Sequence, residues 1–304
     1  MKVSRILLVA LLAISVFALT GQAQNVSQNF GQNQSVNWTT QTVQATGIGA
    51  SNPNLPAAAA RASAIRAAKL DALRNMLETI KGMYLNSETT VRNAMVESDV
   101  IRTQVEGIAQ GFRITDGPRY LSDGSVEVVV EMPITGQLAD AVLPGQFGGG
   151  QLQPGGQMLC PTCGQPWPAG KPVPPGMNLQ QTGGTMPANA NAVFTGLIVD
   201  CKGLGIRPAM APKIVDENGN EVYGSKYVSR QWAVEIGMVG YDKDLNRARR
   251  NDRVTANPLV IKGLRASGQN KTDVVISAAD AAQLHQAAAN QNFLDKCKVM
   301  FIVN

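Results

Sequence analysis

A stretch rich in proline, glycine and glutamine divides this chain of 304 residues into two parts. Residues 144–191 contain few aliphatic side chains, so they cannot bury enough apolar surface to offset the conformational entropy that folding removes. We expect this segment to be a disordered linker that is extended where its prolines cluster. The sequences on either side contain enough apolar residues for hydrophobic cores, which predicts two small domains, residues 37–143 and residues 192–304.

The N-terminus has the three parts of a secretory signal peptide. Lys2 and Arg5 supply positive charge, and residues 6–20 form an apolar run that is shorter than the roughly 20 residues of a membrane-spanning helix. Gly21-Gln22-Ala23 offers small residues at the two positions that a signal peptidase inspects, so we predict that residues 1–23 are removed after Ala23. No cysteine lies near this cut, and we therefore expect a periplasmic or outer-membrane-associated protein without a direct lipid anchor.

The charge and polarity of the remaining chain exclude several classes of function. The formal net charge is +5, and two of these positive charges leave with the signal peptide. The remainder is too small to indicate nucleic-acid binding. No later segment is apolar for long enough to cross a membrane. Residues 24–36 are mostly glutamine, asparagine and serine, and we expect them to form a flexible leader.

One long helix dominates the first domain. Pro53 precedes it and Gly82 is a natural stop, while Ala62, Ile65, Ala72, Leu73, Met76, Leu77 and Ile80 recur at spacings of three and four. Its first turns are nearly all alanine, which suits close packing on a sheet. We predict strands over residues 38–49, 84–91, 112–115, 119–121 and 126–132, and a weaker helix over residues 94–108. Asp123-Gly124 predicts a tight turn between the last two strands.

The second domain contains more strand signals than helix signals. We predict strands over residues 193–201, 213–215, 221–223, 232–239, 258–261, 273–276 and 297–303, with Asn218-Gly219 marking a hairpin. Ser277 and Asp280 resemble a capping box that opens a helix over residues 278–289. The expected fold class is α+β, in which each domain is an antiparallel or mixed sheet packed by one or two helices.

The four cysteines allow several interpretations. Cys160 and Cys163 in the linker have the spacing of one knuckle of a zinc ribbon, but a structural zinc ion needs four ligands and no second knuckle exists. They could form a local disulfide or free thiols, share a zinc ion between two chains, or act in redox chemistry, which the surrounding prolines disfavour. Cys201 ends one predicted strand and Cys297 begins another, so a disulfide is feasible if those strands are neighbours; two buried free thiols are the alternative.

The sequence offers little for catalysis. His285 is the only histidine and lies on a predicted helix, where a surface position is the more common role. A Ser-His-Asp triad would rest wholly on it, and no Gly-x-Ser-x-Gly motif is present. Gly203-Leu204-Gly205 lacks the third glycine of a dinucleotide fingerprint. We expect a protein that is not an enzyme and that has no cofactor, apart from a zinc ion at Cys160 and Cys163 if one binds there.

The long helix and the segments after it carry a pattern found in a known family. The helix contains Lys69-x-Asp71-Ala72-x-x-Asn75-Met76-Leu77-x-x-Ile80-x-Gly82, followed by Val91, Gly111-Phe112, Asp123-Gly124 and Val126-Glu127-Val128. Over about residues 37–135 this pattern resembles the bacterial 20-kDa outer-membrane lipoprotein family, which includes the N-terminal module of flagellar assembly T-type and basal-disk P-type proteins. The second domain resembles a module that accompanies this helix in exported proteins, through Thr195-Gly196-Leu197-Ile198-Val199-Asp200, Gly203-Leu204-Gly205 and Arg207-Pro208-Ala209.

The resemblance implies a non-enzymatic envelope protein, often part of a ring or sheath around the flagellar motor, and it supplies no catalytic residues. We therefore expect a structural or assembly component of an outer-membrane or flagellar basal-body ring. Its two domains would lie on a flexible tether, and it would act by self-association or by docking on envelope proteins, with peripheral outer-membrane association. The alternative is an envelope metal-binding or thiol-redox protein that uses Cys160 and Cys163, and a hydrolase that depends on His285 is a second rival.

Overall fold

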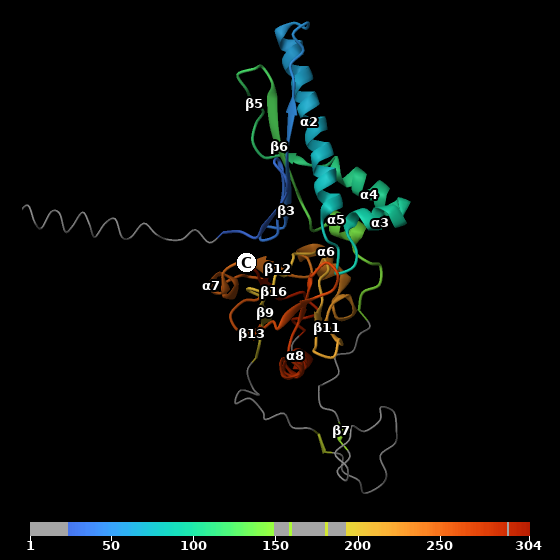
Figure 1. The fold of residues 1–304 in the computed structure, drawn as a ribbon, viewed down its shortest axis with the longest axis vertical. Coiled ribbons are helices and arrows are strands. Elements are labelled where there is room, and N and C mark those ends of the chain that lie inside the picture. The colour runs from blue at the N-terminus through green and yellow to red at the C-terminus, as the bar shows by residue number, and fades with distance from the viewer. Residues whose placement is uncertain (1–23, 149–157, 160–179, 182–192, 291) are drawn as a thin grey trace, which may run out of the picture.

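The computed structural model describes residues 24–148, 158–159, 180–181, 193–290 and 292–304. The predicted signal peptide and most of the predicted linker, including Cys160 and Cys163, lie outside these residues. The described chain forms two modules stacked along its longest axis, which we call the N-terminal module (residues 24–143) and the C-terminal module (residues 193–304) (Figure 1). Both contain sheets and helices, so the predicted α+β class is confirmed.

The N-terminal module is an antiparallel sheet with helix α2 along one face (Figure 1). The strand order is β1-β2-β3-β6-β4, and β5 also pairs with β6. Two short helices follow α2, and a third follows β6 at the base of the module. The elements are β1 (Ser27–Gly31), β2 (Gln34–Asn37), β3 (Thr42–Gly49), α2 (Ala57–Gly82), α3 (Val91–Glu97), α4 (Asp99–Ala109), β4 (Arg113–Ile114), β5 (Arg119–Tyr120), β6 (Val126–Pro133) and α5 (Gln137–Val142).

Helix α2 packs unusually close to strand β3. The buried side of its first half consists of alanines at a spacing of four, Ala60, Ala64, Ala68 and Ala72. Opposite them β3 has glycines: a Cβ added at Gly47 would lie 2.2 Å from the Ala68 carbonyl oxygen, and one at Gly49 would lie 2.0 Å from the Ala64 carbonyl oxygen. The predicted apolar stripe is thus shifted here: Ala62 and Ile65 are only half-buried, and the alanines at a spacing of four lie against β3 instead.

Two polar side chains of α2 complete the hydrogen bonding of β3. Strand β2 pairs with β3 only as far as Ala45, which leaves the last residues of β3 without a strand on that side. The carboxylate of Asp71 accepts a hydrogen bond from the Ile48 amide at 3.0 Å, and the Asn75 amide donates to the Thr46 carbonyl at 2.8 Å. Asp71 and Asn75 therefore cover an exposed strand edge, which otherwise invites pairing with another chain.

Several predictions for the N-terminal module are wrong. The expected flexible leader over residues 24–36 contains β1 and β2, and its apolar residues Val26 and Val36 are buried beside Trp38. The expected strand over residues 84–91 is a loop closed by a single bridge between Tyr84 and Thr90. The expected helix over residues 94–108 is two helices, because Ser98 ends α3 and its hydroxyl accepts a hydrogen bond from the Ile101 amide at the start of α4.

The C-terminal module contains two four-stranded sheets. One has the order β12-β16-β9-β13 and is parallel throughout; the other has the order β11-β10-β15-β14 and is mixed. The elements are β9 (Gly196–Asp200), β10 (Ile214–Val215), β11 (Glu221–Tyr223), a 3-10 turn η1 (Ser225–Tyr227), α6 (Arg230–Ile236), β12 (Gly240–Asp242), α7 (Leu245–Arg249), β13 (Pro258–Lys262), β14 (Arg265–Ser267), β15 (Asp273–Val275), α8 (Ala278–Asn290) and β16 (Val299–Ile302).

The parallel sheet is the centre of this module. Strand β16 is buried along its whole length between β12 and β9, as its continuous apolar sequence predicts for a parallel strand covered on both faces. One face packs on Ala248 of α7, and the other joins the main hydrophobic core. The prediction of only antiparallel or mixed sheets is therefore wrong for this sheet, since local sequence patterns do not encode the direction of the neighbouring strand.

Local signals in the C-terminal module predict some elements correctly and one incorrectly. The carboxylate of Asp216 accepts hydrogen bonds from the Asn218 and Asn220 amides in the predicted β10–β11 hairpin. The Ser277 hydroxyl accepts from the Asp280 amide at 3.0 Å at the start of α8, as a capping box requires. The expected strand over residues 232–239 is instead mostly helix α6, because its apolar residues fit either periodicity over so short a run.

The predicted linker includes two short strands within the described residues. Strands β7 (Met158–Leu159) and β8 (Gln180–Gln181) pair antiparallel, so these four residues differ from the disordered state that we predict for residues 144–191.

Candidate functional site at the junction of the two modules

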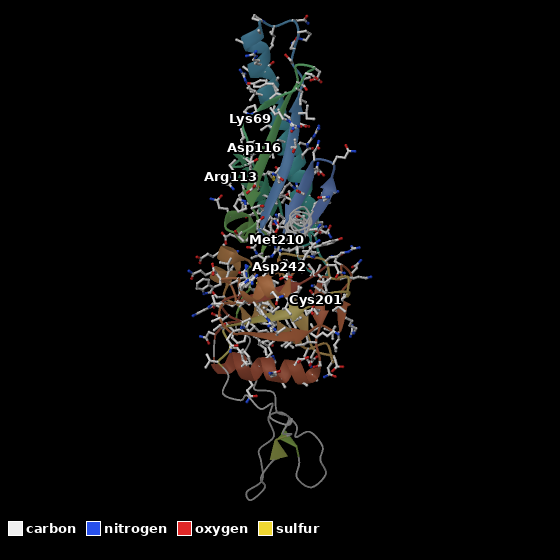
Figure 2. The ribbon with its side chains drawn as sticks, turned by 90° about the vertical axis from the view of Figure 1, so that its left-hand side faces the viewer. Lys69, Arg113, Asp116, Cys201, Met210 and Asp242 are labelled. Carbon is white, nitrogen blue, oxygen red and sulfur yellow. The ribbon has the colours of Figure 1, made fainter. Side chains whose placement is uncertain are left out.

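The loop between α2 and α3 of the N-terminal module docks on the C-terminal module through backbone hydrogen bonds. The Met210 amide donates to the Tyr84 carbonyl at 3.0 Å, and the Ala211 amide donates to the Leu85 carbonyl at 2.7 Å. The Asn270 amide donates to the Ser87 carbonyl at 2.9 Å. Figure 2 places Met210 at the boundary between the modules. Because these bonds join backbone atoms, the contact fixes the position of the loop.

Side chains reinforce this docked loop. The guanidinium of Arg207 donates to the Tyr84 hydroxyl at 2.8 Å and lies 5.7 Å from the centre of the same ring. Ser87 contacts Gly268, whose φ of +80° and lack of Cβ allow the approach, since a Cβ there would lie 2.2 Å from that of Ser87. The Ser87 hydroxyl also bonds the carboxylate of Asp273. Burial raises the pKa of Asp273, and the hydrogen bonds from Ser87 and from the Lys213 amide partly offset this rise.

An aromatic cluster forms a second contact between the modules. Trp38, which is 1% exposed, meets the ring of Tyr241 edge-on at 5.7 Å, and Tyr241 in turn meets Phe301 of β16 at 5.9 Å. The Tyr241 hydroxyl donates to the Ala209 carbonyl and accepts from the Ala209 amide. These edge-to-face ring contacts connect the β2–β3 turn to the central parallel sheet and, through Tyr241 and Ala209, to the segment that bonds Tyr84.

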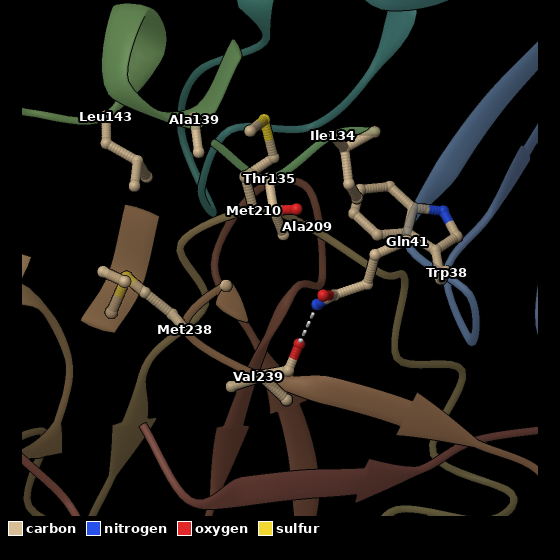
Figure 3. A pocket seen from close by; sticks show the side chains of 12 residues that line it. Trp38, Gln41, Ile134, Thr135, Ala139, Leu143, Ala209, Met210, Met238 and Val239 are labelled. Carbon is tan, nitrogen blue, oxygen red and sulfur yellow. Dashed lines mark hydrogen bonds between the residues drawn. The ribbon is translucent and has the colours of Figure 1, made fainter. Parts of the chain in front are cut away.

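A small apolar cavity lies between these contacts (Figure 3). Its volume is about 20 Å³, which is space for about one water molecule. At its edge the Gln41 amide donates to the Val239 carbonyl at 3.4 Å, and Met210 and Met238 fill much of the remaining space (Figure 3). The cavity is too small for a substrate, so this part of the junction is a packed interface.

Helices α5 and α6 form a third contact. The Gly136 amide donates to the Val234 carbonyl at 2.7 Å, and Arg230 forms an ion pair with Asp140 while also donating to the Asp140 carbonyl. Asp140 and Arg230 are partly exposed, so we expect their ion pair to contribute less than about 1 kcal/mol to stability.

The three contacts join the modules into one body with a continuous core. Buried residues from Val26 to Val303 belong to a single hydrophobic cluster that crosses the junction. The sequence predicts the two domains but not that they pack on each other through a shared core. A composition-based boundary does not show whether the segments on either side of it also pack on each other.

Comparison with known families identifies each module. Residues 38–133 match the model of the LPP20 lipoprotein family. The N-terminal module is therefore similar to the LPP20 family. This confirms the resemblance seen in the sequence over about residues 37–135. Residues 196–304 match the model of the second domain of Treponema pallidum Tp0624. The search of curated proteins finds no match. The LPP20 match supports the coarser prediction, an exported protein associated with the cell envelope.

The LPP20 pattern corresponds to features that build the fold. Asp71 and Asn75 cover the edge of β3, and Ala72 and Met76 are buried on the sheet. In the C-terminal module Gly203 and Gly205 have φ of +77° and +67°, which favours glycine, and Arg207 then reaches Tyr84 of the LPP20 module. No helix among the described residues is long and apolar enough to cross a membrane.

Of the two alternatives left open for Cys201 and Cys297, a disulfide or two buried free thiols, the structure has the second. The strands that carry them, β9 and β16, are indeed neighbours, but they run parallel with Asp200 opposite Ile302. Cys201 therefore lies at the carboxyl end of the sheet and Cys297 at the opposite end, six residues away in register, or about 20 Å. A disulfide needs Cα atoms within about 7 Å.

We predict that both thiols are unreactive in the folded protein. Burial raises the pKa of Cys297 to about 11 and raises the pKa of Cys201 well above its usual range. At pH 7 both are protonated, so iodoacetamide should alkylate them about a hundredfold more slowly than in guanidinium-unfolded protein, as measured by peptide mass spectrometry. Equal alkylation rates in the folded and the unfolded protein would contradict the burial of Cys201 and Cys297.

The remaining predicted site residues do not assemble into a centre in the described part of the chain. His285 lies half-buried on α8. Within the described ranges, no three His, Cys, Asp or Glu side chains gather where they could hold a metal ion. Cys160 and Cys163 lie outside those ranges, so the zinc prediction remains a prediction.

The junction residues are the ones that sequence reasoning missed. The sequence-based prediction places Trp38 and Tyr84 in strands and Arg207 in a family pattern. It does not indicate that the three residues act together at one interface. A large apolar side chain such as Trp38 beside a polar segment indicates that another part of the chain covers it. Only the structure shows that this partner is Tyr241.

Proposed function

We propose that this protein is a non-enzymatic structural or assembly component of the cell envelope, which acts through protein contacts at an outer-membrane or flagellar basal-body ring. The LPP20 match supports the envelope location. The ring assignment rests on the resemblance to flagellar assembly and basal-disk modules, and anchoring without a lipid rests on the sequence around Ala23, where no cysteine occurs.

The observation that carries this proposal is a set of exposed apolar side chains on a rigid body. Val96 of α3 is 72% exposed, Val100 of α4 is 67% exposed, and Leu70 of α2 is 68% exposed. Val96 also lines a shallow hollow of about 320 Å³ with the charged residues Glu78, Arg92 and Arg102. Exposed apolar side chains beside charged ones are typical of a protein-binding surface.

Envelope fractionation with matched variants tests the proposal. The full-length wild-type protein should sediment with the outer-membrane or basal-body fraction. The double variant Val96→Asp/Val100→Asp should lose at least fivefold of this recovery, because it places charge at two exposed apolar positions without changing a buried residue. Gln104→Asp, on the exposed side of α4, is the control and should fractionate like the wild type. Recovery of the wild type only as a soluble periplasmic monomer would contradict the proposal.

The alternative function, metal binding or thiol redox chemistry, rests on the spacing of Cys160 and Cys163. Metal analysis of the purified protein separates the two hypotheses. Stoichiometric zinc that is lost in Cys160→Ser would favour the metal-binding function, whereas metal-free protein that fractionates normally would favour the structural one.

A further inference from the structure

A buried carboxylate lies at the junction, under the docked loop between α2 and α3. Asp273, the first residue of β15, is only 5% exposed. Its carboxylate accepts hydrogen bonds from the Lys213 amide at 2.9 Å and from the Thr272 hydroxyl at 3.3 Å. A third hydrogen bond comes from the Ser87 hydroxyl of the docked loop. Asp273 therefore bonds groups from both modules.

The burial of this carboxylate depends on the docking of the loop. Ser87 is itself buried, and its backbone carbonyl accepts a hydrogen bond from the Asn270 amide at 2.9 Å. The Ser87 side chain also lies against Gly268, where no Cβ keeps it away. The docked loop thus keeps water from Asp273, and an opening of the junction would expose the carboxylate to solvent.

The charged and titratable groups around Asp273 do not neutralise it by a direct ion pair. None of the ion pairs among the described residues includes Asp273. Lys213 attracts the carboxylate, but this is the smallest of the effects that favour the charged form, and the Lys213 ammonium pairs with Glu221 of β11 at 3.1 Å. Tyr241 of β12 also interacts with Asp273, and burial raises the pKa of its hydroxyl well above the usual range.

The charged residues of the neighbouring loops are engaged elsewhere. Glu88 of the docked loop and Lys271 before β15 are exposed, and the Arg207 guanidinium donates to the Tyr84 hydroxyl. At the point of contact the docked loop supplies the Ser87 hydroxyl, which carries no charge. A negative charge on Asp273 is thus stabilised mainly by neutral hydrogen-bond donors.

The protonation of Asp273 is linked to the docking of the loop. Burial raises the pKa of Asp273 above its ordinary value, and the hydrogen bonds from Ser87, the Lys213 amide and Thr272 offset only part of this rise. A carboxyl group with a raised pKa binds a proton more tightly in the docked state than in an open, solvated one. Docking is therefore strongest below the ordinary pKa of an aspartate and weakens as the pH rises through the raised pKa.

We propose that Asp273 makes the junction sensitive to pH: uptake of one proton from solvent by its carboxylate tightens the docking of the loop, and release of that proton loosens it. The inference goes beyond the proposed function, since it concerns how firmly the two modules hold each other rather than what they bind.

Amide hydrogen exchange of the full-length protein at Met210 and Ala211 tests this proposal, with each rate corrected for the intrinsic effect of pH. At pH 7 we expect Asp273→Asn to protect these amides at least threefold better than the wild type, because the side-chain amide has a similar shape and no charge. The difference should disappear as the pH falls toward 4, where the wild-type carboxylate takes up its proton. The wild type should thus gain protection on acidification.

Two further variants separate this effect from a general effect of acid. Ser87→Ala keeps the backbone hydrogen bonds of the loop but removes a hydroxyl that favours the charged form of Asp273, so its gain in protection should begin at a higher pH than in the wild type. Asp140→Asn removes the carboxylate of the α5–α6 contact and is the control, which should keep the gain of the wild type.

Equal protection in the wild type and Asp273→Asn at pH 7 would overturn the proposal, and so would a pH profile in Ser87→Ala that matches the wild type. Weaker protection in Asp273→Asn than in the wild type at pH 7 would also overturn it, because the charge would then strengthen the docking. The exchange measurement does not depend on envelope fractionation, so its failure would remove only this inference.

Discussion

Replacing Gly47 with alanine is expected to destabilise the N-terminal module by about 3 kcal/mol or more. The added Cβ would lie 2.2 Å from both the Ala68 carbonyl oxygen and the Ala72 amide nitrogen, and backbone atoms in the middle of a helix cannot move aside individually. The helix would have to separate from β3, which would also break the hydrogen bonds of Asp71 and Asn75. Urea denaturation followed by circular dichroism measures the loss.

Gly107→Ala is the matched control for this substitution. Gly107 lies within α4, and a Cβ added there would meet nothing within 4 Å. We expect this variant to gain about 0.5–1 kcal/mol, because alanine costs less conformational entropy in a helix. Equal stability of Gly47→Ala and Gly107→Ala would contradict the close packing of α2 on β3 that is described above.

Trp38→Ala is expected to have the second large effect, at the junction. Removing this buried ring from its contact with Tyr241 should cost about 3–5 kcal/mol. It should also uncouple the modules, because Trp38 joins the N-terminal sheet to the segment around Ala209 through Tyr241. Differential scanning calorimetry should show a single main transition in the wild type and two separate transitions in the variant.

Tyr120→Ala serves as the control for the loss of an aromatic ring. Tyr120 is 57% exposed on β5, away from the junction, and it contacts Arg61 at 5.8 Å. We expect it to change stability by less than about 1 kcal/mol and to leave the transition single. Two transitions in the wild type, or one in Trp38→Ala, would show that the modules are not coupled through this ring.

Sequence reasoning predicts those elements that depend on local signals. Helix α2 ends at Gly82 as expected, the hairpin at Asn218-Gly219 forms, and the capping box at Ser277 opens α8. In each case the determining residues lie within a few positions of one another, so the pattern and the structure that it encodes are both local.

The remaining features depend on distant partners. Strand β1 is polar except for Phe30 and pairs with β2, a partner that its own sequence does not indicate. The parallel direction of β16 relative to β9 keeps Cys201 and Cys297 apart. The junction combines Trp38, Tyr84, Arg207 and Tyr241, which are separated by up to about 200 residues, and nothing near any one of them indicates the others.

The central claim, that the two modules form one rigid body, is tested most directly by amide hydrogen exchange at Met210 and Ala211. Their amides donate to the Tyr84 and Leu85 carbonyls across the junction. If the modules stay docked, these two amides exchange as slowly as those of the core strands β9 and β16 in the same protein. Exchange within seconds at neutral pH, while β9 and β16 remain protected, would show that the junction opens freely and would contradict the account.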